Sequence, residues 1–319
     1  MNTELLKKSQ SLIALILLCM AISLLSDKFL TANNLWNVLR QISVNVVISA
    51  GMTLVVLIAG IDLSVGSVLA FSSVVCAGLL KNGIQLPTFD LLIGFTVLGG
   101  ILSALFIGLA LGLFNGWIIT KFALPSFVVT LAMLTMARGA TMLYSEGIPI
   151  SDLGKNFEFI GSGWLLGIPV PVWIAGLIVF TMFILTKKTV LGRYIYAVGG
   201  NENAAFSSGI NVNQIKIAVF GIAGMLAAVG GILVTSRLNS AQPNAGLSYE
   251  LDSIAAVVIG GTSLSGGVGT ITGTVIGAVI IGVLNNGLIL LDVSPFWQQI
   301  VKGMVILLAV IIDKQSKKK

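Results

Sequence analysis

Long runs of apolar and small residues, separated by short charged segments, make up most of the chain. A helix that spans a bilayer needs about 20 mostly apolar residues, with a range of roughly 17–25. The runs that qualify are 9–26, 41–61, 63–80, 91–120, 122–145, 159–186, 217–236, 253–291 and 293–312. The run 253–291 is too long for one span and contains a glycine-rich break at 260–269, so it counts as two. The pattern predicts an all-α integral membrane protein, a polytopic bundle of about ten transmembrane helices.

Some of these helices are expected to be short or broken. Asp62 stands between two runs that barely reach spanning length, inside the glycine-flanked segment 59–67. Either a tight turn between two helices or a helix broken within the membrane would explain this, and in a broken helix the freed backbone groups would line a cavity. The segment 260–269 repeats the spacing G-x-x-L-S-x-G, which is weak support for an internal repeat. Because residues 253–261 are too few to span, the chain is expected to bend or re-enter there.

Composition points to the same class of protein. Charged residues make up 9% of the chain and apolar residues 56%, whereas soluble domains are about 25% charged. This excludes a soluble enzyme and a disordered chain. The two cysteines, Cys19 and Cys76, lie in apolar stretches and histidine is absent, so no disulfide framework or metal site is expected.

The placement of lysine and arginine predicts the orientation in the membrane. With ten spans and a cytoplasmic N-terminus, eleven of these residues fall in inner segments and five in outer ones, while Arg138 and Lys302 fall within spans. Both termini are therefore expected in the cytoplasm. Arg138, near the end of a span, is expected to snorkel or to pair, with Glu146 as the candidate partner.

No polar segment is long enough to form a core of its own, so residues 1–319 are expected to be a single transmembrane domain. The run 9–26 is expected to remain as the first helix. It lacks the small-x-small cleavage site of a signal peptide and is followed by Asp27 and Lys28.

Several uncharged polar residues fall inside the predicted spans. They either bond to one another between helices, or line a path for a hydroxyl-rich solute by offering donors and acceptors without charge. As a group they suit a neutral polar substrate better than an ion. The candidate translocation path consists of Asn45, Asp62, Ser64, Asn115, Asn285 and Asn286.

The longest inner polar segment, 187–216, shows signs of local structure. Asn201 can cap a short helix, and 203–208 is a candidate helical turn ended by Gly209. Phe206 and Ile210 would be exposed on the cytoplasmic face, which favours a docked partner over packing back onto the bundle. The chain contains no G-x-x-x-x-G-K-[ST] phosphate loop. If the protein pumps, the nucleotide is expected to be bound elsewhere.

The segments 192–209, 239–252 and 255–269, together with 51–66, 138–144 and 285–291, resemble the permease family of bacterial ATP-binding-cassette sugar importers. The likeness runs from about residue 11 to residue 313. It implies a multi-pass protein of the bacterial inner membrane, two copies of which form the channel. It also implies a cytoplasmic ATPase with two cassettes, which uses ATP and magnesium, and a periplasmic sugar-binding protein. The chain itself is then a translocation subunit, neither an enzyme nor the holder of a cofactor or metal.

The resemblance also implies a substrate and a coupling segment. The substrate is expected to be a pentose, ribose or a related monosaccharide. The coupling segment falls within the cytoplasmic loop 187–216 and comprises Gly192, Arg193, Gly199, Gly200, Asn201, Glu202, Phe206, Gly209 and Ile210. The alternative is a proton-coupled secondary transporter of a small polar solute, for which Asp62 would be the main intramembrane carboxylate. Asp292 stands where relatives often have glycine.

Overall fold

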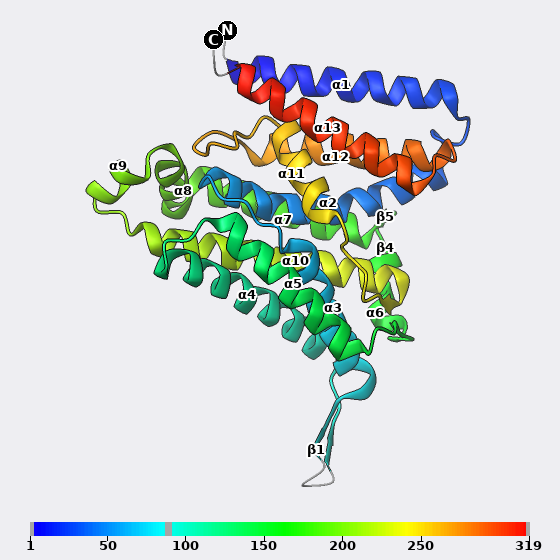
Figure 1. Ribbon diagram of the computed structural model, residues 1–319. Coiled ribbons are helices and arrows are strands. Elements are labelled where there is room, and N and C mark those ends of the chain that lie inside the picture. Colours follow the sequence, from blue (N-terminus) through cyan, green and yellow to red (C-terminus); the bar gives the residue numbers. More distant parts are fainter. Residues whose placement is uncertain (1–2, 87–90, 317–319) are drawn as a thin grey trace. The chain divides into compact units, whose positions relative to one another are not determined.

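The computed structural model describes residues 3–86 and 91–316, and within them the chain is helical apart from short strand pairs (Figure 1). Lys317, Lys318 and Lys319, which entered the charge count, lie outside the described residues. The helices are α1 (Thr3–Leu25), α2 (Ala32–Leu57), α3 (Val65–Asn82), α4 (Val97–Lys121), α5 (Ser126–Ser145), α6 (Lys155–Ser162), α7 (Val170–Lys188), α8 (Val190–Gly200), α9 (Glu202–Ser207), α10 (Val212–Leu238), α11 (Tyr249–Ile259), α12 (Ile271–Leu290) and α13 (Pro295–Ser316). The strands are β1 (Ile84–Leu86), β2 (Leu91–Ile93), β3 (Ile150–Ser151), β4 (Trp164–Leu165), β5 (Ile168–Pro169) and β6 (Ser240–Ala241).

Within residues 3–86 and 91–316, seven helices are long and apolar enough to cross a membrane: α2, α3, α4, α5, α7, α10 and α12. The expectation of an all-α polytopic membrane protein is thereby confirmed. Both predicted interruptions are present, because non-helical backbone separates α2 from α3 and α11 from α12. The total of ten spans and the side on which the termini lie remain predictions.

The chain forms two compact units, each assembled from separate stretches of sequence. Unit 1 comprises Met1–Gly60, Ala175–Val212 and Leu251–Lys319, and unit 2 comprises Ile61–Ile174 and Asn213–Glu250. In unit 1, α12 packs against α1 and α2, and the hydroxyls of Thr53 and Thr274 lie 2.7 Å apart between α2 and α12.

In unit 2, α3 packs against both α4 and α5 (Figure 1). A small apolar core lies at one end of α3 and includes Cys76, Ala104 and the fully buried Phe157. The antiparallel pair β3–β6 joins two distant segments of this unit, with Ser151 opposite Ser240. Lys81, at the end of α3, donates to the carbonyl of Ser151 at 2.8 Å, so α3 is tied to the same pair.

Glycines let α4 and α10 of unit 2 pack backbone against backbone. A Cβ atom added to Gly112 would overlap the carbonyl oxygen of Phe220, and one added to Gly108 would overlap that of Gly224. Small residues that allow such close approach are characteristic of helix contacts in membranes, where packing replaces the hydrophobic effect. The outer face of α4 is left apolar, and the Phe106 side chain there is 71% exposed, as suits contact with lipid.

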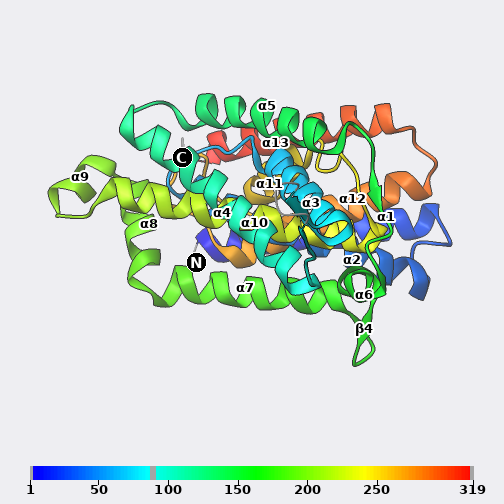
Figure 2. The same ribbon diagram turned by 90° about the horizontal axis from the view of Figure 1, so that it is seen from below.

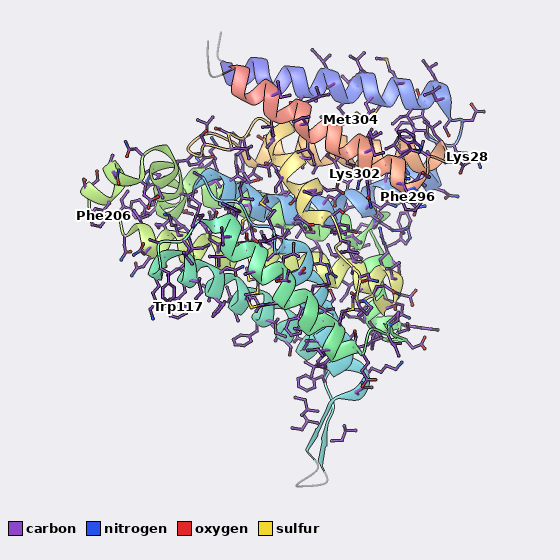
Figure 3. All side chains as sticks on the ribbon, viewed as in Figure 1. Lys28, Trp117, Phe206, Phe296, Lys302 and Met304 are labelled. Carbon is purple, nitrogen blue, oxygen red and sulfur yellow. The ribbon has the colours of Figure 1, made fainter. Side chains whose placement is uncertain are left out.

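An ion pair holds together three helices of unit 1. Lys302 on α13 lies 3.0 Å from Asp252 on α11, and these side chains are 21% and 6% exposed (Figure 3). Asn285 on α12 donates to the same carboxylate oxygen at 3.4 Å. A lone lysine within an apolar helix needs such a partner, because an unpaired charge is expensive in the membrane.

We expect Gly112→Ala to destabilise the protein, because the added methyl meets a rigid backbone carbonyl instead of a side chain that can move away. Overpacking of this kind costs about 1–3 kcal/mol, which should lower the melting temperature of the purified protein in detergent. Gly139→Ala on α5 is the matched control, since no described heavy atom lies within 4 Å of its added Cβ. Equal melting temperatures for the two variants would contradict the close α4–α10 packing.

We also expect Lys302→Met to lower the melting temperature by about 5 °C or more, because it leaves the Asp252 carboxylate buried without a counter-charge. Adding Asp252→Asn to Lys302→Met should recover most of the loss, since the remaining side chain is then neutral. A double variant as unstable as the single one would show that the charge pair is not what stabilises these helices.

Candidate functional site

The candidate site is the non-helical segment between α2 and α3. Its second half, Ile61–Ser64, belongs to unit 2, and Asp62 and Ser64 there are each 1% exposed. The amide of Ile61 donates to the Ser126 hydroxyl at 3.0 Å, and that of Leu63 to the Thr130 hydroxyl at 3.1 Å. Hydroxyl groups of α5 therefore satisfy backbone groups that an intact helix would have satisfied internally, as non-helical backbone in a membrane protein requires.

Asp62, Ser64 and Asn115, three of the predicted path residues, meet at this segment. One carboxylate oxygen of Asp62 accepts from the Ser64 amide at 2.8 Å and from the Ser64 hydroxyl at 2.6 Å. The side-chain amide of Asn115, on α4, donates to that hydroxyl at 3.1 Å. Asn115 is 1% exposed, and its Oδ1 atom has no hydrogen-bond partner in the described part of the chain. We call these three residues the polar triad.

The triad lies at the start of α3. Ser64 is the N-cap residue of α3, so the carboxyl group of Asp62 lies beside the first turn of that helix. The triad thus presents a buried carboxyl group together with a buried amide oxygen that lacks a donor. Both groups accept hydrogen bonds, and hydroxyl or ammonium groups of a solute are the matching donors.

A loop of unit 2 closes over the beginning of α3. Gly66 and Gly246 are packed so tightly that a Cβ atom on either would overlap the backbone of the other. Arg138 on α5 fixes the same loop by donating to the carbonyls of Pro243 and Ala245 at 2.7 and 2.9 Å. The suggested pairing of Arg138 with Glu146 is therefore not what the structure has. The guanidinium instead bonds to two backbone carbonyls of this loop.

The remaining predicted path residues belong to unit 1. Asn286 and Asn34 exchange two amide hydrogen bonds, at 2.9 and 3.0 Å, which is the helix-bridging role that the sequence left open. Asn285 joins the Lys302–Asp252 pair, and its own Oδ1 atom is buried without a partner among the described residues. Asn45 is half-buried on α2. No pattern in the sequence predicts the pairing of Asp252 with Lys302.

The expected coupling segment consists of two short helices, α8 and α9. Asn201 ends α8 and begins α9, and its side chain accepts from the Ala204 amide at 3.0 Å, as predicted. Gly209, at a φ of 84°, follows the end of α9. Figure 2 shows α9 beside α8. Phe206 on α9, labelled in Figure 3, is 73% exposed. Gly192 is buried, whereas Arg193, Gly200 and Glu202 are exposed.

Comparison with known proteins agrees with this architecture. The family described as branched-chain amino acid transport system / permease component matches residues 34–310, which include the polar triad and α8–α9. The ribose import permease protein RbsC of Haemophilus influenzae is 51% identical over 310 residues, 96% of this chain and 93% of its own length.

More distant relatives cover the chain almost as fully. RbsC of Bacillus subtilis is 48% identical over 306 residues, 95% of this chain and 92% of its own. The D-allose transport system permease protein AlsC of Escherichia coli is 40% identical over 298 residues, 93% and 88% of the two chains. No solved structure matches the chain. The resemblance found in the sequence is confirmed, and the chain belongs to this family of transport-system permease components, as a multi-pass protein of the bacterial inner membrane.

Proposed function

We propose that this chain is the membrane-spanning subunit of an ATP-driven importer that passes ribose into the cytoplasm. The observation that carries the proposal is the near-full-length identity of 51% and 48% to ribose import permeases, against 40% to a D-allose permease. The family description names branched-chain amino acids instead, so the substrate needs a direct test.

The proposed importer has three kinds of component besides lipid. Two copies of the permease enclose the path, a periplasmic binding protein delivers the sugar, and a cytoplasmic subunit with two cassettes hydrolyses ATP with magnesium. This chain holds none of the nucleotide chemistry, because its sequence has no phosphate loop. It supplies the path and the surface that the ATPase contacts.

The proposed topology has ten crossings with both termini in the cytoplasm. To the seven long apolar helices we add three further crossings. These are α1, α13, and α11 together with the non-helical segment before it. An even number of crossings places the two termini on one side, and the excess of lysine and arginine in the predicted inner segments selects the cytoplasm. The α8–α9 segment then lies inside, where the exposed Phe206 can meet the ATPase.

The polar triad is the part of the path that we assign to the sugar. Ribose is neutral and carries hydroxyl groups that can donate to the Asp62 carboxylate and to the free Oδ1 atom of Asn115. Because all three triad residues are about 1% exposed, this conformation is closed to the solute. ATP-driven rearrangement would have to open the triad in turn to the two sides of the membrane.

The function is tested by reconstituting the chain in proteoliposomes with its ATPase and ribose-loaded binding protein. We expect ATP-dependent ribose uptake that excess D-allose or leucine competes with poorly. Uptake that persists without the ATPase and follows a proton gradient would support the secondary transporter instead. Uptake of leucine but not ribose would overturn the sugar assignment and favour the substrate in the family description.

We expect Asp62→Asn to reduce ribose uptake at least about tenfold, because the substitution exchanges one carboxyl oxygen of the triad for an NH2 group that only donates, and a buried hydrogen-bonding group left without its partner costs about 1–3 kcal/mol. The amide oxygen can still accept from Ser64, so the melting temperature in detergent should change little. Asp292→Asn is the matched control, since Asp292 is exposed at the end of α12. Full uptake by Asp62→Asn would remove the triad from the path.

A further inference from the structure

Three segments of unit 1 meet at the carbonyl group of Leu57, the last residue of α2. The Leu57 oxygen accepts a hydrogen bond from the amide of Gly267 at 2.9 Å. Gly199 of α8 lies against the same oxygen so closely that an added Cβ atom would overlap it, and that Cβ would also lie 2.7 Å from the Gly267 nitrogen. We call this meeting of Leu57, Gly199 and Gly267 the glycine joint.

The joint uses a carbonyl that a helix end leaves free. The last carbonyls of an α-helix have no partner within the helix and must find one elsewhere. At the end of α2, Ala59 and Gly60 donate to Val56 and Val55 at 2.9 Å each, and Ala59 has a φ of 58°. This is the hydrogen-bond pattern of a Schellman ending. The Leu57 carbonyl is left over and bonds to the glycine-rich segment that precedes α12.

A second contact fixes α8 to the same glycine-rich segment. The Tyr196 hydroxyl, one turn before Gly199, donates to the carbonyl of Gly269 at 2.7 Å. Ile195 and Val198 on α8 are 0% and 3% exposed. Thus α8 is held at two points to residues 267–269 and at one point to α2.

The α8–α9 segment has no loose connection that could absorb movement. Asn201 is at once the C-cap of α8 and the N-cap of α9, so a single residue separates the two helices. A partner that displaces α9 through Phe206 therefore displaces α8 as well. At the joint, the contacts are between backbone atoms of Leu57, Gly199 and Gly267. A change of side-chain rotamer therefore cannot relieve a displacement of α8.

We propose that the glycine joint positions the end of α2 according to the position of α8–α9, and so links ATPase docking to the segment that carries the polar triad. This inference rests on the proposed ATP-driven function. The covalent chain from Leu57 leads within a few residues to Asp62. Gly199, Leu57 and Gly267 act as positioning residues, since they touch neither nucleotide nor sugar.

Two glycines of unit 1 offer a matched test. Gly199→Ala must push apart Leu57 and Gly267, whereas Gly176→Ala on α7 adds a methyl that has no described heavy atom within 4 Å outside its own helix backbone. Both substitutions are identical in chemistry and lie within helices. We expect Gly199→Ala to lower the ribose taken up per ATP hydrolysed at least about tenfold, while Gly176→Ala stays within about twofold of the parent.

Stability is measured alongside, so that a structural effect can be recognised. If Gly199→Ala has a lower melting temperature but the parental ratio of ribose to ATP, the residue only supports the fold and the proposal is wrong. If Gly199→Ala does not accumulate in the membrane, Tyr196→Phe decides, because it removes only the bond to the Gly269 carbonyl. We expect a several-fold lower ratio at an unchanged melting temperature, and a parental ratio would overturn the proposal.

A measurement without sugar separates this proposal from the proposed function. Hydrogen exchange at the amides of residues 57–60 is followed in the complex with the ATPase, with and without a non-hydrolysable ATP analogue. We expect nucleotide-dependent exchange in the parent and in Gly176→Ala, and none in Gly199→Ala. Exchange that ignores nucleotide in the parent overturns the joint while ATP-dependent uptake stands. Failure of the parent to take up ribose overturns the substrate assignment while the exchange result still judges the joint.

Discussion

The structure depends on one constraint, which is that backbone groups within the hydrocarbon region must find partners inside the protein. Regular helices meet it by themselves. In the non-helical segment after α2, the hydroxyls of Ser126 and Thr130 accept hydrogen bonds from the amides of Ile61 and Leu63. At the end of α2, the Gly267 amide donates to the Leu57 carbonyl. Asp62 and Ser64 of the polar triad, and Gly267 of the glycine joint, lie at places where something other than a regular helix satisfies backbone groups.

Meeting the constraint at these places also explains the use of glycine. Where a carbonyl of one helix must lie directly against another segment, any side chain would hold the two apart. Gly112 against Phe220 and Gly199 against Leu57 show the same arrangement in two different units. Gly112 is one of several glycines along the contact of α4 with α10, and this contact holds two long helices together. Gly199 makes one local contact with Leu57, and in our proposal that contact moves the end of α2 when α8 moves.

The sequence was informative where the signal is local. Apolar run length and charge placed the helices and both interruptions, and the cap at Asn201 followed from residue type and spacing. The bond from Asn115 to Ser64, the Lys302–Asp252 pair and the contact of Gly199 with Leu57 join residues far apart in the chain. A pattern along one sequence contains no distances between such residues.

The shared spacing G-x-x-L-S-x-G shows the same limit. Ser64 in the first copy is the N-cap of α3, but Ser265 in the second lies within the loop, and Thr270 caps α12 instead. The two stretches match in letters and differ in structural role. The glycines and serines of both segments therefore predicted non-helical backbone. The role of each serine depends on where the next helix begins, which the spacing does not predict.

The reciprocal bonds between Asn34 and Asn286 have a consequence for how unit 1 can move. Each amide donates to the other, so the pair is satisfied in a single alignment of α2 with α12. Sliding one helix by a single residue, about 1.5 Å, would break both bonds together, and of the four amide groups only the Asn34 nitrogen, which also donates to the Phe29 carbonyl at 2.9 Å, would keep a partner. The amide pair thus opposes sliding of α2 along α12, because sliding breaks both bonds. Any transport step that displaces α2 must carry α12 with it as one rigid body.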